Sequence, residues 1–194
     1  MAKRRKLTTE PEYHGYPINT GENNNLACDT KILDTNERVL DSFLEKHSRA
    51  LVARFDVTFP QGYKPDGNEE LKEIMKQTIT SEQRHSGSKP NYVAVKEKSQ
   101  DGVPHYNGLI ILDNHVKKSP LNVIKEMERI AVQVIGEEAQ KYVHPGIVHL
   151  GANPLVVHRG NEEERGEALY RGSYLAKLKD KDDTGREIFC SKTK

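Results

Sequence analysis

Hydrophobic residues recur along this chain with two different periods, which predict helices and strands in alternation. Four segments carry apolar residues three or four positions apart, and this spacing predicts helices near 35–49, 68–84, 120–139 and 162–178. The stripe of Leu71, Ile74 and Met75 is one example. We expect the first helix to begin after Asp34, because aspartate is a preferred residue at helix starts.

Other segments alternate apolar and polar residues, which is the pattern of a half-buried strand. Residues 50–59 alternate in this way, and residues 92–98 and 104–112 flank an Asp101-Gly102 turn that predicts a hairpin. Shorter strands are expected at 146–150 and 155–158, with a possible strand at 187–190. This order indicates an α/β (α+β) fold with an antiparallel-rich central sheet flanked by helices.

The first 30 residues show neither period. They are polar and rich in glycine and proline, so we expect residues 1–30 to form a polar tail or an irregular arm. Residues 31–194 are enough for one packed domain, and the composition, 35% hydrophobic and 30% charged, is ordinary for a globular protein.

The formal net charge of +1 argues against a protein that coats nucleic acid through bulk electrostatics, so any DNA binding has to be local. No apolar run approaches the roughly 20 residues of a membrane helix, and the start lacks the apolar stretch of a signal peptide. We therefore expect a cytoplasmic protein. Cys28 and Cys190 have no metal-type spacing, which predicts neither a disulfide framework nor a zinc site.

A first candidate site lies on the predicted hairpin. His105 and Asn107 project from one face of their strand while Tyr106 points away, because alternate side chains share a face. A three-residue turn at 100–102 would place Glu97 opposite His105, whereas a two-residue turn would place it opposite Tyr106. A carboxylate, an imidazole and an amide oxygen suit Mg²⁺ or Mn²⁺ better than zinc. The alternative interpretation is an edge histidine beside an exposed glutamate.

A second candidate site lies on the last predicted helix, where Tyr170, Tyr174 and Lys177 stand at positions i, i+4 and i+7. At about 100° per residue, these side chains fall within a narrow arc that is largely separate from the aliphatic face. The alternative interpretation is that both tyrosines are packing residues of an amphipathic helix.

The two candidate sites together fit one reaction, the attack of a tyrosine hydroxyl on a phosphodiester. A metal ion holds the phosphate and neutralises its charge, and Lys177 assists a phenol whose unperturbed pKa is near 10. The phosphotyrosyl bond keeps the energy of the broken link, so the strand can be rejoined without ATP.

Four stretches of the chain carry a family resemblance: Arg54-Phe-Asp-Val-Thr-Phe59, Val95-Lys-Glu-Lys98, Pro104-His-Tyr-Asn-Gly-Leu-Ile-Ile-Leu112, and Tyr170-Arg-Gly-Ser-Tyr-Leu-Ala-Lys177 followed by Phe189-Cys-Ser191. They resemble, in turn, the first core strand, the glutamate-bearing strand, the metal-binding His-hydrophobe-His strand and the nucleophile helix of the HUH endonuclease superfamily. The resemblance is greatest to inovirus gene-two-type rolling-circle replication initiation proteins of the two-tyrosine type, and it implies an HUH-endonuclease/RRM-like sandwich.

This resemblance implies a site-specific DNA nicking-joining endonuclease that initiates rolling-circle replication on single-stranded or hairpin origin DNA. Tyr174 or Tyr170 attacks a phosphate, which leaves a 5′-phosphotyrosine and a free 3′-OH. We expect Tyr174 to attack first, because it precedes Lys177 by three residues as in single-tyrosine relatives, and the other tyrosine to close the circle. Glu97, His105 and Asn107 are the implied ligands of Mg²⁺ or Mn²⁺, with Asn107 in place of the family's second histidine.

The sequence contains no Gly-x-x-x-x-Gly-Lys-Ser/Thr loop, so unwinding is expected from supercoiling or from a host helicase, and synthesis from a host polymerase. Two other functions stay open. One is a plasmid mobilisation relaxase with the same chemistry, and the other is a non-catalytic nucleic-acid-binding regulator on the same fold. Five other histidines are expected to be surface or hydrogen-bonded residues: His85, His115, His144, His149 and His158.

Overall fold

A computed structural model of the chain describes residues 5–24, 26–60, 63, 68–98, 104–136, 147–178 and 188–192. Its central sheet contains β5 Arg49–Thr58, β6 Asn91–Lys98, β7 Pro104–Asp113, β8 Val148–Leu150, β9 Leu155–His158 and β10 Ile188–Cys190. The helices are α1 Thr30–Leu44, α2 Glu69–Ser86, α3 Leu121–Ile135, α5 Glu162–Gly172 and the 3₁₀ helix η2 Ser173–Ala176. The strand order is β10-β6-β7-β5-β8, with β9 also pairing with β5, and every pairing is antiparallel.

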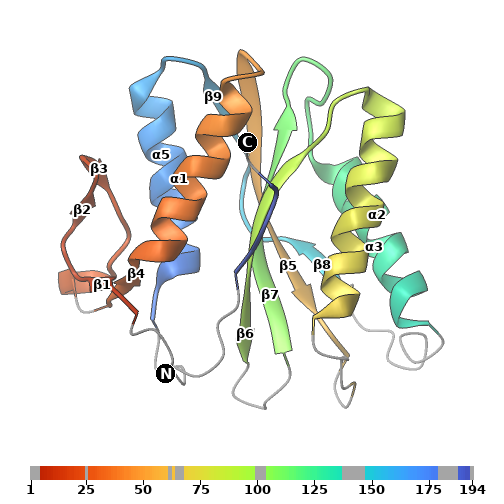
Figure 1. Cartoon of the computed structure of the whole chain (residues 1–194), viewed down its shortest axis with the longest axis horizontal. Coiled ribbons are helices and arrows are strands. Elements are labelled where there is room, and N and C mark those ends of the chain that lie inside the picture. Colours follow the sequence, from red (N-terminus) through yellow and green to blue (C-terminus); the bar gives the residue numbers. More distant parts are fainter. Residues whose placement is uncertain are drawn as a thin grey trace.

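Helices cover both faces of this sheet (Figure 1). The α1 and α5 helices lie on one face, and the α2 and α3 helices lie on the other. The predicted antiparallel sheet flanked by helices is therefore confirmed. The hairpin of β6 and β7 and the short strands β8, β9 and β10 also form where the alternating pattern predicts them.

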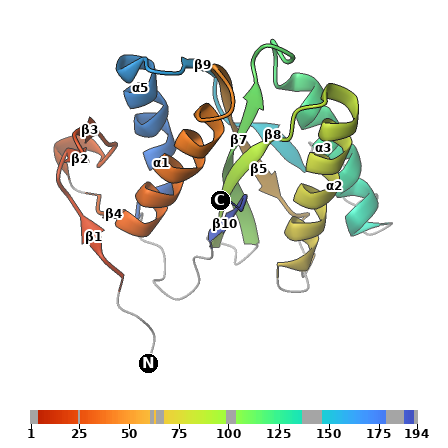
Figure 2. The same ribbon diagram turned by 45° about the horizontal axis from the view of Figure 1, so that its top comes forward.

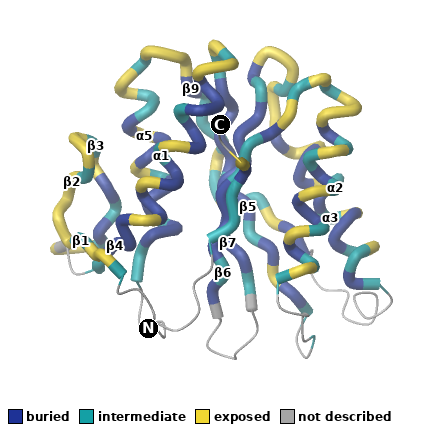
Figure 3. Tube along the Cα trace, in the orientation of Figure 1, coloured by how far each residue is buried: buried dark blue, intermediate teal, exposed yellow. Residues whose placement is uncertain are grey.

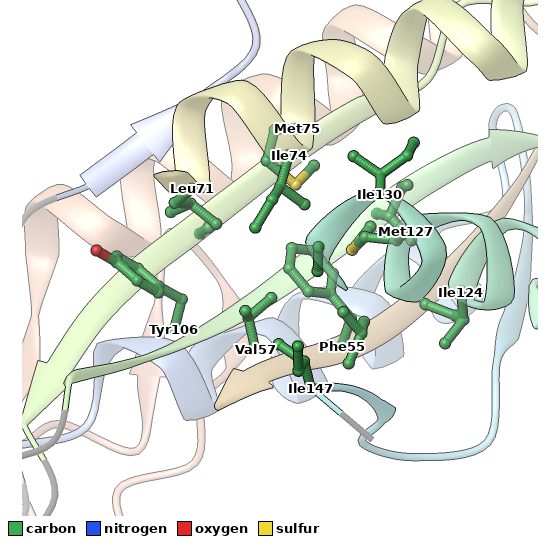
Figure 4. Packing of buried hydrophobic residues seen from close by; sticks show 14 of the residues in the cluster. Phe55, Val57, Leu71, Ile74, Met75, Tyr106, Ile124, Met127, Ile130 and Ile147 are labelled. Carbon is green, nitrogen blue, oxygen red and sulfur yellow. The ribbon is translucent and has the colours of Figure 1, made fainter. Parts of the chain in front are cut away.

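The central strand β5 supplies side chains to two hydrophobic cores, because alternate residues point to opposite faces. Phe55 and Val57 pack with Leu71 and Met75 of α2 and with Met127 of α3 (Figure 4). On the opposite face, the first half of β5 joins the core beneath α1 and α5. Dark blue segments of the chain trace both cores in Figure 3. Complete burial of a side chain such as Phe55 stabilises the fold by about 1.5–3 kcal/mol.

The first helix differs from its prediction at both ends. It begins at Thr30 because Asp29 is the capping residue, and the Asp29 side chain accepts a hydrogen bond of 2.9 Å from the Lys31 amide. The helix ends at Leu44 rather than near residue 49. The expected start at Asp34 was wrong because buried Ile32 and Leu33 extend the apolar stripe toward the N-terminus.

Residues 5–24 form an irregular arm that packs against α1 and α5 (Figure 2). Its elements are β1 Leu7–Thr8, β2 Glu12–Tyr13, β3 Tyr16–Pro17 and η1 Glu22–Asn24, and β1 pairs with β4 Cys28–Asp29. The Tyr16 ring lies 4.4 Å from the Arg165 guanidinium carbon, and Ile18 is only 6% exposed. The arm therefore contributes to the core beneath α1 and α5.

Two further expectations concern helix length and membranes. The helix expected to reach residue 139 ends at Ile135, where Gly136 adopts a positive φ of 73°, and residues 137–146 lie outside the described part.

None of the helices in the described ranges is long and apolar enough to cross a membrane.

Gly108 of β7 leads to a stability prediction. A methyl group at this position would overlap the Phe55 ring and would lie 2.9 Å from the Val93 carbonyl oxygen. We expect Gly108→Ala to lower the free energy of unfolding by about 2–3 kcal/mol, measured by urea denaturation.

The matched control is Gly166→Ala in α5, where the nearest atom to the added methyl group is Tyr16 Cδ1 at 3.3 Å. Alanine also favours the helix by about 1 kcal/mol over glycine, so this variant should stay within about 1 kcal/mol of the wild type. Equal unfolding midpoints for Gly108→Ala and the wild type would contradict the packing of β7 against β5.

Candidate functional site

A buried carboxylate and a histidine face each other on the β6–β7 hairpin, at the end of the sheet that is lowest in Figure 1. Glu97 pairs directly with His105, which is the register that a three-residue turn predicts, although the turn itself lies outside the described residues. Glu97 Oε2 is 3.2 Å from His105 Nε2. Because Glu97 is only 6% exposed, its carboxylate depends on such partners.

Asn107 is the second partner of this carboxylate. Its Nδ2 donates a hydrogen bond of 2.7 Å to Glu97 Oε2, and the residue is buried. Tyr106 points to the opposite face, where its hydroxyl donates to Asn68 Oδ1 at 3.0 Å. The predicted alternation of residues 105–107 is confirmed, and the structure brings all three predicted metal ligands together.

The neighbouring strand β5 adds two charged residues that the sequence analysis did not single out as functional. Asp56 pairs with Asn107 of β7 on one side and with His149 of β8 on the other. Arg54 Nη2 lies 3.8 Å from Asp56 Oδ1. The sequence signal was present, because residues 54 and 56 are both charged and share the face of a strand that otherwise contributes to the core.

Burial raises the pKa of the Asp56 carboxyl above its ordinary value, and the nearby Arg54, His105 and His149 only partly oppose this effect. Asp56 Oδ1 is buried and has no hydrogen-bond partner within the described residues. The carboxylate is thus incompletely satisfied, and it lies next to the pair formed by Glu97 and His105.

Tyr174 lies over this part of the sheet. The Arg54 guanidinium carbon is 4.1 Å from the centroid of the Tyr174 ring, and Lys177 Nζ is 5.7 Å from the same centroid. Tyr174 is partly exposed, so its ring contacts both cations and solvent. Tyr174 therefore contacts the sheet through Arg54, and Lys177 contacts the Tyr174 ring.

The segment that carries Tyr174 changes from α-helix to 3₁₀ helix after Gly172, and the predicted helix 162–178 was wrong for residues 177 and 178, which follow the end of the 3₁₀ helix at Ala176. The α5 helix ends at Gly172, and Tyr174 belongs to the 3₁₀ helix η2. Asn36 Nδ2 donates 2.9 Å to the Gly172 carbonyl, and Ser173 Oγ donates 2.6 Å to the Tyr170 carbonyl. Lys177 is extended, with φ −60° and ψ 131°, so the expected α-helical arc of Tyr170, Tyr174 and Lys177 does not form.

Tyr170 lies in the last turn of α5, and the residue is 39% exposed. Among the described residues, no ring contact links Tyr170 to Arg54 or to Lys177, whereas Tyr174 contacts both. The two tyrosines are thus placed differently, one at the surface and one over the charged face of the sheet.

The donor set of Glu97, His105 and Asn107 fits a hard divalent cation if the amide contributes its oxygen. Within the described ranges, no three His, Cys, Asp or Glu side chains form a group that could hold a metal ion, and at this site the Asn107 amide oxygen would be the third donor. The amide nitrogen faces Glu97 here, and a rotation of about 180° exchanges it for the oxygen. Water would fill the remaining positions that Mg²⁺ or Mn²⁺ requires.

Of the five other histidines named above, His149 lies next to this donor set, because it pairs with Asp56 in the sheet. His85, His115, His149 and His158 are exposed. His158 Nδ1 is 2.8 Å from Glu164, and His144 lies outside the described residues.

The fold and this site define a class of protein: a helix-covered antiparallel sheet with a polar cluster at one end and a tyrosine above it. The model of one protein family, the YagK/YfjJ C-terminal domain, matches residues 8–190. The chain belongs to the YagK/YfjJ C-terminal domain family. Comparisons with curated proteins and with solved structures found no match.

The raised pKa of Asp56 predicts how Asp56→Asn changes stability with pH. Below the unfolded pKa, near 4, both states are protonated, and as pH rises through the higher folded pKa the wild type loses stability. The asparagine variant does not suffer this loss. The free energy of unfolding of Asp56→Asn, relative to that of the wild type, should therefore be higher at pH 7 than at pH 3. The increase should be about 1.4 kcal/mol for each pH unit between the two pKa values.

Urea denaturation in EDTA at the two pH values measures this difference. A difference between variant and wild type that is constant with pH, or larger at pH 3, would show that Asp56 is not destabilised in its ionised form.

Proposed function

We propose that this chain is a metal-dependent endonuclease and strand transferase that nicks and rejoins single-stranded DNA, and that it initiates rolling-circle replication. The observation that supports this most is the position of Tyr174, on the same face of the sheet as His105 and Asn107 and in contact with Arg54. A nucleophile, a set of cation ligands and two side-chain cations then surround one region of the molecule. Attack on a phosphate diester requires these same components.

In the proposed reaction, the Tyr174 hydroxyl oxygen attacks phosphorus and forms a phosphotyrosyl bond. The bond to the 3′ oxygen breaks, its electron pair stays on that oxygen, and solvent exchanges the proton lost by the phenol for the one gained by the new 3′-OH. A divalent ion held by Glu97, His105 and Asn107 would supply charge neutralisation at the phosphate. Lys177 Nζ lies 5.7 Å from the centroid of the Tyr174 ring, which puts a second side-chain cation beside the proposed nucleophile.

Tyr170 is proposed to act second. It lies one turn earlier and is 39% exposed, so it can receive the strand when the circle is closed, as expected for a two-tyrosine enzyme. Origin DNA in single-stranded or hairpin form is the proposed substrate, with a host helicase and polymerase as partners. Mobilisation by a relaxase uses the same chemistry, and the origin sequence alone would distinguish it.

Covalent capture tests this proposal. Labelled single-stranded DNA from the protein's replicon is incubated with the protein and Mn²⁺, and SDS-resistant adducts are quantified. We expect Tyr174→Phe to abolish the first adduct, because it removes only the nucleophilic oxygen. His105→Ala should lower the yield at least 100-fold, through loss of a ligand to the ion.

Tyr170→Phe is the matched control for Tyr174→Phe, because both changes remove one hydroxyl group from the same segment. It should form the first adduct at the wild-type rate and fail in closing the circle. Tight DNA binding without any adduct from the wild type would overturn the catalytic proposal.

A second prediction concerns Asn107. Imidazole is a better ligand for Mn²⁺ than an amide, so Asn107→His should tighten Mn²⁺ binding roughly tenfold, which is about 1.4 kcal/mol. Calorimetric titration with Mn²⁺ measures this, with Glu97→Gln as a variant that should lose binding. Weaker or unchanged binding by Asn107→His would remove position 107 from the proposed ligand set.

One observation favours a second candidate function, a regulator that binds hairpin DNA or RNA without cutting it. The Asn107 amide nitrogen donates directly to Glu97, an arrangement that satisfies the carboxylate without any ion. Such a regulator would bind nucleic acid equally well with Mn²⁺ or EDTA, and would form no adduct with either.

A further inference from the structure

The Arg54 side chain is mostly buried and yet poorly satisfied. Only 18% of the side chain is exposed, and its Nε is buried without a hydrogen-bond partner. The described residues offer the guanidinium no carboxylate oxygen nearer than Asp56 Oδ1, at 3.8 Å, which is too long for a hydrogen bond. Burying a charged group away from water costs free energy unless hydrogen bonds compensate for it. Because a guanidinium can donate five hydrogen bonds, Arg54 has donors that a ligand can use.

The surrounding backbone preserves this arrangement. Gly151 follows β8, and its amide donates 3.0 Å to the Arg54 carbonyl. A methyl group at Gly151 would lie 2.7 Å from Asp56 Oδ2 and 3.5 Å from Arg54 Nε. The glycine therefore allows β8 to approach both charged side chains closely, and a side chain at this position would force the Asp56 carboxylate to shift.

The guanidinium also contacts Tyr174, whose ring centroid is 4.1 Å from the guanidinium carbon. Arg54 therefore has two neighbours, the Asp56 carboxylate in the sheet and the Tyr174 ring. Guanidinium groups bind phosphate through two parallel hydrogen bonds, and stacking on an aromatic ring leaves the edge of the group, with its donors, available.

We propose that Arg54 is a phosphate-binding residue, and that the phosphodiester attacked by Tyr174 rests against its guanidinium. This inference depends on the proposed function for the role of Tyr174, and it adds a catalytic residue that contacts the substrate directly. During attack, negative charge develops on the non-bridging phosphate oxygens. A fixed guanidinium stabilises the transition state, which carries this extra charge, more strongly than it stabilises the ground state. Arg54 neither gains nor loses a proton in this step.

The experiment compares Arg54→Gln and Arg54→Lys in two assays. The first is the single-turnover rate of adduct formation on labelled single-stranded DNA with Mn²⁺. Arg54→Gln should lower this rate by about 100- to 1000-fold, the loss typical of removing one preorganised donor. Arg54→Lys keeps the charge without the paired donors, so its rate should lie between those of Arg54→Gln and the wild type.

The second assay measures DNA affinity against salt concentration in EDTA, so that no cutting is needed. Loss of one phosphate contact should reduce the slope of log affinity against log salt by about 0.7, the value for single strands. Urea denaturation accompanies both assays. Arg54→Gln removes the cation beside the Asp56 carboxylate and should be less stable than the wild type, so both assays are run at a temperature where each variant is folded.

Arg49 supplies the matched control, since it lies on the same strand and its Nη2 is already hydrogen-bonded to His115 Nδ1 at 2.9 Å. Arg49→Gln should leave the adduct rate and the salt slope unchanged. An unchanged rate and slope for Arg54→Gln would overturn the inference. If the wild type forms no adduct, the proposed function fails, and the salt slope still decides whether Arg54 binds phosphate.

Discussion

Strand β7 pairs with β6 on one side and with β5 on the other, and the register of these two ladders sets how the sheet residues of the candidate site face one another. It places His105 opposite Glu97, and Asn107 opposite Asp56. A slip of one residue would turn His105 toward the core beneath α2 and α3 and bring Tyr106 into the site. The complete burial of Tyr106 opposes such a slip, so core packing on one face maintains the chemistry on the other.

The site places charge where a sheet covered by helices ordinarily has apolar side chains. Asp56 Oδ1 and Arg54 Nε are both buried without hydrogen bonds, and each such group costs about 1–3 kcal/mol. The fold tolerates this cost because two separate cores lie on the two faces of the sheet. Local instability of this kind is typical of residues that are retained for binding or catalysis.

The N-terminal arm and α1 hold the segment that carries Tyr174. Ser173 Oγ accepts a hydrogen bond of 2.7 Å from the Asn19 amide, and the Leu178 amide donates 2.8 Å to the Ala27 carbonyl. Residues on both sides of Tyr174 are therefore fixed by a region that is distant in sequence. The family match, which begins at residue 8, includes most of this arm, so the arm is part of the domain that defines the family.

The sequence by itself determined the order of most elements, the opposite faces of His105 and Tyr106, and the choice of Glu97 as the partner of His105 once a turn length was assumed. These features depend on residues close together in the chain, where periodicity and turn length suffice. The sequence did not determine the start of α1, the end of α5, or the position of Arg54 and Asp56 beneath Tyr174. The start of α1 depends on a local cap, since the Asp29 side chain accepts from the Lys31 amide. The end of α5 and the contact of Arg54 with Tyr174 depend on packing between distant segments, as in the hydrogen bond from Asn36 to Gly172 across 136 residues.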